Sequence, residues 1–215
     1  MHNLKSKLKT NTNILLIIPL LLVISTVFVV NRDFASPTVA PKYSWFGVSL
    51  ILVAIAGLFL FVINRKSVRL TITDILVSTF CLWGIGLTLY LHDTFSLRLN
   101  ILLLLWIFYL LCRITIVQYK HFYSILLFIL IITGMIEAIW GLGQLYDYYP
   151  SQHNLFKTTG SFYNSGPYAG YLSVILPVSL YYMLFDYRIV KIKFNLKNIF
   201  VYIRWTGSLL AFILI

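Results

Sequence analysis

Charged residues are scarce in this sequence, and acidic residues are the scarcest. Asp, Glu, Lys and Arg make up 11% of the 215 residues, Asp and Glu number only 6, and 60% of the residues are hydrophobic. The mean hydropathy is +0.89. This composition is far too apolar for a water-soluble domain, so the chain is predicted to use the lipid bilayer as its solvent.

Cysteine is scarce as well, with only Cys81 and Cys112. Both lie in apolar runs, where a cysteine most often acts as a small apolar filler. Two such cysteines make no disulfide framework, and no metal-ligand spacing accompanies them. The sequence therefore predicts neither a metal site nor a cofactor.

Long apolar runs are what the sequence has in abundance. A transmembrane helix needs about 20 residues to cross a hydrocarbon core of roughly 30 Å. The runs are continuously apolar, whereas a barrel strand would alternate over about ten residues. The sequence therefore predicts an all-α, polytopic helical bundle with six complete spans, at residues 13–30, 44–63, 70–91, 100–118, 122–144 and 166–185.

A seventh apolar run, residues 205–215, stops where the sequence stops. As a helix it would be about 16 Å long, roughly half of the hydrocarbon core. A start at Ile199 would lengthen it but would place Arg204 inside the span, which is unfavourable by a few kcal/mol near the bilayer centre. We therefore expect a truncated seventh span, with residues 1–215 forming the N-terminal part of one longer integral membrane domain.

The basic residues predict the orientation. A formal net charge of +11 would suggest nucleic acid as the partner of a soluble protein, but in a membrane protein Lys and Arg gather in cytoplasmic loops. If the N-terminus is cytoplasmic, most of the 17 Lys and Arg lie inside, and the outer ones are Arg32, Lys42, Arg98 and Lys157. We therefore expect a cytoplasmic N-terminus and no nucleic-acid partner.

The first apolar run also has features of a secretory signal peptide. Lysines precede it, and Thr38-Val39-Ala40 has the small residues of a cleavage site. Pro41 directly after Ala40 disfavours cleavage, and the run is longer than a usual signal-peptide core. An uncleaved span is the favoured interpretation.

The longest polar segment, residues 145–165, is expected to be a periplasmic loop. Tyr146, Tyr148 and Tyr149 lie close together in it. Aromatic faces can stack on sugar rings, and amide or hydroxyl groups can pair with sugar hydroxyls. The alternative is an aromatic belt at the membrane interface, which is the favoured explanation for the tyrosines taken alone.

The end of this loop has the pattern of a helix start. Asn164 or Ser165 can cap the sixth predicted span, and Pro167 fits its first turn because no backbone N–H is needed there. The free N–H groups and the dipole of such a start can hold a phosphate-bearing headgroup. The alternative is an ordinary helix cap. Charge and hydroxyl donors for the same anion are expected from Lys157, Thr158, Thr159 and Ser161.

Glu137 is a carboxyl inside the fifth predicted span, about 10 Å from the outer end at 1.5 Å per residue. Either it faces a polar cavity, or it is protonated and shares a hydrogen bond with a neighbouring helix.

Other charged residues have structural explanations: Thr71 and Asp74 form a capping-box pattern, and Arg113 lies near the inner end of its span, where it can snorkel. Stripes of small residues also predict close helix packing, namely Gly134, Ala138 and Gly141 on the fifth span and Gly166, Gly170 and Ser173 on the sixth.

One segment carries a family resemblance. A span ends in Gly141-Leu142-Gly143-Gln144, and a polar loop leads to Thr159-Gly160-Ser161-Phe162-Tyr163-Asn164. Ala169-Gly170-Tyr171-Leu172 and Pro177 follow on the next span. This arrangement resembles the signature of the O-antigen ligase and O-antigen polymerase family of bacterial membrane proteins, over roughly residues 137–177.

The resemblance implies a metal-independent glycosyltransferase of the GT-C kind in the bacterial inner membrane. Such an enzyme takes a glycan from an undecaprenyl diphosphate carrier at the periplasmic face and passes it to lipid A core, a growing polysaccharide or a protein. The family's catalytic arginines and histidines lie in a large outer loop beyond the matched segment, so no catalytic residue is assigned here. The expected contributors to the donor site are Lys157, Thr159, Ser161, Asn164 and Glu137.

Two other functions fit the sequence. The chain could belong to a transporter or flippase, with Glu137 as an intramembrane coupling group. It could also be a non-catalytic membrane remnant that retains the family's helices. Sequence beyond Ile215, with further spans and a long outer loop rich in Arg and His, would favour the glycosyltransferase.

Overall fold

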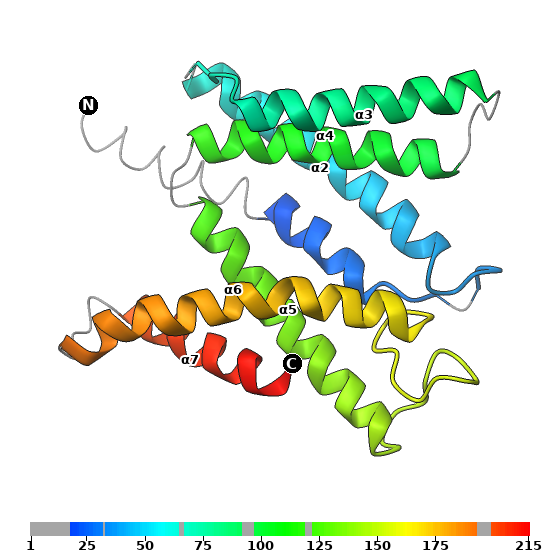
Figure 1. The fold of residues 1–215 in the computed structure, drawn as a ribbon, viewed down its shortest axis with the longest axis vertical. Coiled ribbons are helices and arrows are strands. Elements are labelled where there is room, and N and C mark those ends of the chain that lie inside the picture. The colour runs from blue at the N-terminus through cyan, green and yellow to red at the C-terminus, as the bar shows by residue number, and fades with distance from the viewer. Residues whose placement is uncertain (1–17, 32, 65–66, 92–96, 119–121, 193–198) are drawn as a thin grey trace. The chain divides into compact units, whose positions relative to one another are not determined.

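The computed structural model describes residues 18–31, 33–64, 67–91, 97–118, 122–192 and 199–215. All regular elements in these ranges are helical (Figure 1), which confirms the all-α prediction for this part of the chain. They are the 3-10 helix η1 (Thr26–Phe28) and the α-helices α2 (Ala40–Asn64), α3 (Ile72–Tyr90), α4 (Leu97–Gln118), α5 (Phe122–Leu145), α6 (Ser165–Ile192) and α7 (Ile199–Leu214).

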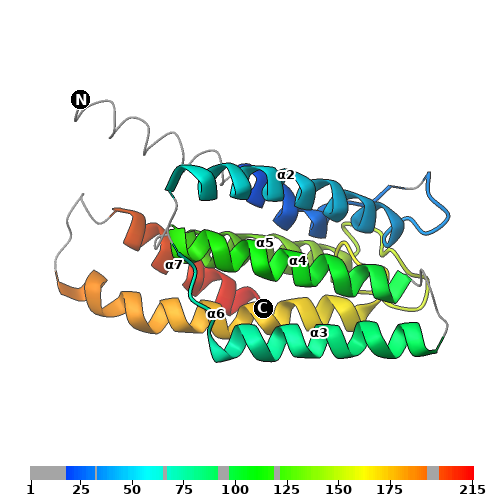
Figure 2. The same ribbon diagram turned by 90° about the horizontal axis from the view of Figure 1, so that it is seen from above.

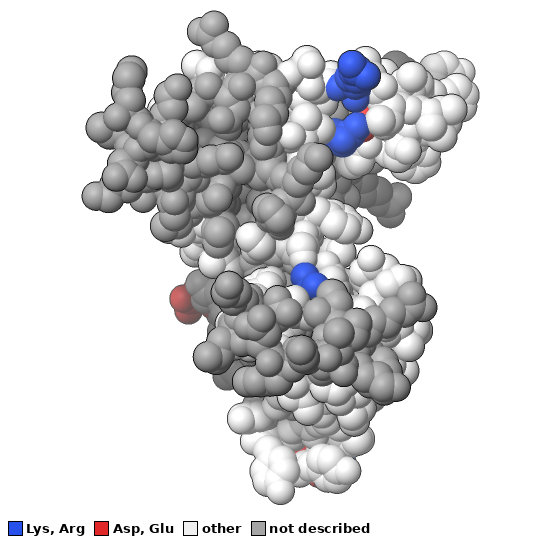
Figure 3. All heavy atoms as spheres, turned by 90° about the vertical axis from the view of Figure 1, so that its left-hand side faces the viewer, with Lys and Arg blue, Asp and Glu red and all other residues white. Residues whose placement is uncertain are grey.

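Helices α2 to α6 are long and apolar enough to cross a membrane. Each overlaps one of the predicted spans, because a continuous apolar run of this length has no other way to satisfy its backbone in lipid. Large apolar side chains lie on their surfaces: Phe80 and Trp83 of α3 are 70% and 73% exposed. On the face in Figure 3, few charged side chains interrupt the described surface. These helices therefore suit contact with membrane lipid.

The first predicted span, residues 13–30, lies partly outside the described residues. Residues 18–25 are helical and lead into η1. Within the described residues the apolar helix Ile18–Phe28 covers only part of this predicted span, so the count of six spans remains a prediction.

The last helix begins earlier than predicted. We expected residue 205 as the start because Arg204 would otherwise lie in the apolar segment, but α7 begins at Ile199 and includes Arg204. The Arg204 guanidinium donates a hydrogen bond of 2.6 Å to the Ser124 hydroxyl and lies 4.4 Å from the centroid of the Tyr182 ring. These partners accommodate the charge, so the helix extends beyond the predicted apolar run of residues 205–215.

The chain divides into two compact units, which are described separately. The first holds α3, α4 and α2 from Gly47 onward. The second holds η1, the start of α2 up to Phe46, α5 from Ser124, and α6 and α7.

In the first unit, α3 and α4 lie side by side (Figure 2). Asp74 of α3 joins them by binding Tyr109 and Arg113 of α4. The predicted capping box is confirmed: Thr71 and Asp74 satisfy each other's backbone N–H groups at the start of α3. The Asp74 carboxylate also accepts a 2.6 Å hydrogen bond from the Tyr109 hydroxyl and pairs with Arg113 at 3.1 Å. Arg113 therefore lies in a fixed ion pair instead of simply snorkelling.

In the second unit, α6 and α7 lie side by side, and α5 crosses them (Figure 1). Ile131 of α5, Tyr182 of α6 and Ala211 of α7 form a buried core. Close packing along the small-residue stripe of α5 is confirmed, because a Cβ placed on Gly134 would lie 2.6 Å from the Ile175 side chain. Gly170 of α6 differs, since no atom lies within 4 Å of a Cβ placed there.

Candidate functional site

The candidate site is the loop of residues 146–164, which joins α5 to α6 in the second unit. Helix α5 ends where Asp147 adopts a left-handed conformation, with φ of 62°. The Gly143 carbonyl, freed at the helix end, accepts hydrogen bonds from the N–H groups of Tyr148 and Tyr149 at 2.8 and 3.3 Å. Asp tolerates this conformation better than most residues, so the local sequence permits the sharp turn.

Gln144, in the last turn of α5, holds the far end of the loop. Its Oε1 accepts hydrogen bonds from the N–H groups of Thr159 and Gly160 at 2.8 and 2.7 Å. Its Nε2 donates to the carbonyls of Gly160 at 3.0 Å and Pro150 at 3.2 Å. The side chain is 1% exposed, so one buried amide satisfies four backbone groups of the loop.

Gly160 allows residues 159–161, called the strap below, to approach α5 closely. Its φ of 53° lies in the left-handed region that favours glycine. A Cβ at this position would collide with the Glu137 carboxyl and would lie 2.7 Å from the Tyr168 ring. The bare backbone lets the next residue, Ser161, donate its N–H to Glu137 Oε2 at 3.0 Å.

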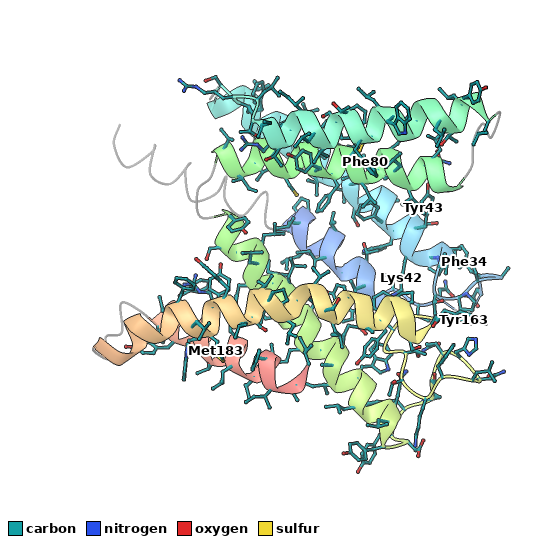
Figure 4. All side chains as sticks on the ribbon, in the orientation of Figure 1. Phe34, Lys42, Tyr43, Phe80, Tyr163 and Met183 are labelled. Atoms are coloured by element: carbon teal, nitrogen blue, oxygen red, sulfur yellow. The ribbon has the colours of Figure 1, made fainter. Side chains whose placement is uncertain are left out.

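Lys42 fastens the strap from the other side. Its ammonium donates hydrogen bonds to the Ser161 hydroxyl at 3.1 Å and to the Val27 carbonyl of η1. The Ser161 hydroxyl donates to the same carbonyl. Lys42 Nζ also lies 5.0 Å from the centroid of the Phe162 ring, within the range of a cation–π contact. Figure 4 labels Lys42 at the start of α2.

The Glu137 carboxyl is fully buried. Its Oε2 accepts from the strap backbone, whereas a polar cavity or a neighbouring helix was expected. Its Oε1 has no hydrogen-bond partner. The carboxyl therefore retains one unused acceptor in the interior of the second unit.

The loop lines an open groove with a volume of about 560 Å³. The His153 ring packs against the rings of Phe156 and Tyr163, with centroids 4.9 and 4.7 Å apart, and so stiffens one wall. The groove combines aromatic rings, amides and one ion pair. It is lined by Gln144, Asp147, Tyr148, Tyr149, Pro150, Ser151, His153, Asn154, Leu155, Phe156 and Lys157.

The five expected donor-site residues fall into two groups. Glu137, Thr159 and Ser161 are fully buried, and the hydroxyls of Thr159 and Ser161 already have partners inside the protein. Lys157 and Asn164 are exposed. The structure therefore does not gather all five around one space, and of these residues only Lys157 lines the groove.

The two exposed residues have local partners. Lys157 Nζ pairs with Asp147 Oδ2 at 3.0 Å, and the two side chains are 55% and 78% exposed. Asn164 Oδ1 accepts a 3.1 Å hydrogen bond from the Gly166 N–H, so the predicted helix cap is present.

Sequence reasoning missed Lys42 and the bridging role of Gln144. Gln144 belongs to the segment that carries the resemblance, but its sequence position does not indicate that it pairs with residues 15 and 16 places later. Lys42 is a single lysine at the start of an apolar helix, with no motif around it. Among the described residues, no three His, Cys, Asp or Glu side chains are placed to hold a metal ion.

Comparison with protein-family models, curated proteins and solved structures finds no match for this chain. The case for a function therefore rests on the chemistry of the loop and on the sequence signature.

Proposed function

We propose that this chain belongs to a membrane glycan ligase or polymerase. Its groove would bind the glycan end of an undecaprenyl-diphosphate-linked donor at the periplasmic face of the bacterial inner membrane. One observation carries the proposal: Gln144, from the first half of the signature, binds Thr159 and Gly160 from the second half. The same side chain lines the groove, so the signature and the groove belong to one structure.

The groove has the chemistry that a sugar requires. Tyr148 and Tyr149 are 79% and 55% exposed, so their rings are accessible for stacking on the apolar face of a pyranose. The Asn154 amide lines the same groove and can exchange hydrogen bonds with sugar hydroxyls, whereas the Ser151 hydroxyl already donates to the Phe156 carbonyl and accepts from the His153 N–H.

Lys157 supplies the positive charge for the diphosphate. Its present partner, Asp147, is exposed, and such pairs are held only weakly. A diphosphate carries more charge than one carboxylate, so it can displace Asp147 from the ammonium. In this proposal the groove binds and orients the donor.

Direct binding tests this proposal. The full chain in lipid nanodiscs is titrated with a short polyprenyl-diphosphate-linked disaccharide, with the polyprenyl diphosphate alone and with the free disaccharide. We expect the linked disaccharide to bind best and Lys157→Ala to weaken it about tenfold, the loss typical of one charged hydrogen bond. Asp33→Asn, which changes an exposed acidic residue outside the groove, is the matched control. Equal affinity for the lipid diphosphate with and without its sugars would contradict a glycan site.

A transporter or flippase is the second candidate, and the unpaired Glu137 Oε1 favours it. Buried carboxyls on membrane helices commonly bind the coupling proton of a transporter. Proteoliposomes separate the two functions, because a transporter moves the labelled lipid-linked glycan across the membrane and Glu137→Gln abolishes that movement. A glycan-binding chain without transport retains the label on the side where it was added.

A further inference from the structure

We propose that Lys42 and Glu137, which bind different atoms of Ser161, clamp this residue from two sides and so position the loop of residues 146–164. The clamp rests on contacts within the second unit. Only its consequence for glycan binding rests on the function proposed above. Lys42 and Glu137 are thus positioning residues, because they act on the groove through the strap.

The two charged side chains hold different atoms of the same residue. Glu137 Oε2 accepts the Ser161 N–H at 3.0 Å, and Lys42 Nζ donates to the Ser161 hydroxyl at 3.1 Å. That hydroxyl donates onward to the Val27 carbonyl, which Lys42 also binds. Ser161 therefore links α5, the start of α2 and η1.

Lys42 and Glu137 bring an ammonium and a carboxyl to the same residue, Ser161. Glu137 is fully buried and its Oε1 has no hydrogen-bond partner, so an ionised carboxylate there needs a nearby positive charge. The tyrosines that face Glu137 are engaged otherwise: Tyr168 donates its hydroxyl hydrogen to the Glu137 backbone carbonyl, and Tyr171 pairs with Thr133. Lys42 is the cation that balances the carboxylate.

A clamp made of two opposite charges has a characteristic response to substitution. Removing either charge leaves the other uncompensated, whether the fully buried Glu137 carboxyl or the half-buried Lys42 ammonium, which is more harmful than losing the attraction between them. Removing both charges abolishes that penalty. The loss of strap order in the double variant should therefore be smaller than the combined losses of the two single variants.

Hydrogen exchange at the strap measures this response. The full chain in nanodiscs is compared as wild type, Lys42→Met, Glu137→Gln and the double variant, by following amide exchange in residues 156–163. Lys42→Arg tests whether positive charge suffices, and Asp33→Asn is the control for loss of an exposed carboxylate. Exchange in the core around Ile131 and Tyr182 checks that each variant still folds.

We expect each single substitution to accelerate amide exchange in the strap about tenfold or more while core protection persists. The acceleration in the double variant should be smaller than the product of the two single accelerations. Lys42→Arg should stay close to wild type. A double variant equal to that product, or single variants that exchange like wild type, would overturn the clamp. If Lys42→Met also loses core protection, Lys42→Gln takes its place in the comparison. Glu137→Met takes the place of Glu137→Gln in the same way.

Binding of the lipid-linked disaccharide to the same variants separates the clamp from the proposed function. Weaker binding in parallel with faster strap exchange supports both. If strap exchange changes as expected but the wild type does not bind the probe, the clamp stands and the glycan function fails. If the wild type binds the probe and the substitutions leave exchange unchanged, the clamp fails and the function stands.

Discussion

Gln144 binds both backbone polar groups of Gly160: its Oε1 accepts the Gly160 N–H at 2.7 Å, and its Nε2 donates to the Gly160 carbonyl at 3.0 Å. The side-chain amide thus supplies the acceptor and the donor that a neighbouring strand would offer to the Gly160 backbone. This pairing closes the loop of residues 146–164 on itself, so that a segment with no regular structure still has a defined groove.

Replacing Gln144 with Ala should destabilise the second unit by about 1–3 kcal/mol, because buried backbone groups lose their partners. Gln144→Glu is the informative comparison: its protonated carboxyl retains one acceptor and one donor, whereas the ionised form places a carboxylate oxygen against the Gly160 and Pro150 carbonyls, so its loss of stability should be smaller at acidic than at neutral pH. Denaturant unfolding in detergent micelles measures both. An Ala variant as stable as wild type would show that the amide is not needed to hold the loop.

Replacing Gly160 with Ala should be destabilising for two reasons, the left-handed φ of 53° and the collision with the Tyr168 ring. We expect a loss of about 1–3 kcal/mol, measured by the same unfolding experiment. Gly166→Ala is the matched control, because an added Cβ there meets only Asn164 Oδ1 at 3.8 Å. If the two alanine variants were equally stable, the tight approach of the strap to α5 would be wrong.

Replacing Gly134 with Ala should overpack the contact between α5 and α6. The added Cβ would lie 2.6 Å from the Ile175 side chain, and overpacking of this kind typically destabilises by about 1–3 kcal/mol. Ile175→Ala removes the colliding atoms, so Gly134→Ala should be much less harmful in that background. Gly170→Ala, which meets no atom within 4 Å, should have little effect. Additive effects of the Gly134 and Ile175 substitutions would rule out this contact.

The predicted orientation can be tested at Leu155, which is 85% exposed in the loop. A Leu155→Cys variant, with Cys81 and Cys112 replaced by Ala, should react with a membrane-impermeant maleimide in cells whose outer membrane alone is permeabilised. The reason is the predominance of Lys and Arg on the opposite side of the predicted spans. Labelling that requires disruption of the inner membrane would reverse the orientation.

Much of the helical framework could be predicted from the sequence, and the contacts around the loop could not. The α2 to α6 helices follow from long apolar runs, and the cap at Asn164 follows from local chemistry. The start of α7 at Ile199 could not be foreseen, because the partners of Arg204 lie on α5 and α6. For the same reason, no local pattern indicated that Lys42 binds Ser161, a residue 119 positions further along.

Burial also changes what the signature residues can do. The sequence suggested that Thr159 and Ser161 offer hydroxyls to a phosphate, because both are polar and lie near a helix start. In the structure their side chains are 0% exposed and bind protein groups. Their position favours a role in holding the loop, while Lys157 and the aromatic residues of the groove are accessible to a ligand.

Photo-crosslinking tests the central claim most directly. A polyprenyl-diphosphate-linked disaccharide with a diazirine on its terminal sugar is bound to the full chain in nanodiscs, irradiated, and the modified peptides are identified by mass spectrometry. The account predicts adducts within residues 148–157, competed by unlabelled lipid-linked disaccharide and reduced by Lys157→Ala. Adducts confined to the apolar faces of the helices, or unaffected by the competitor, would contradict a glycan site in this groove.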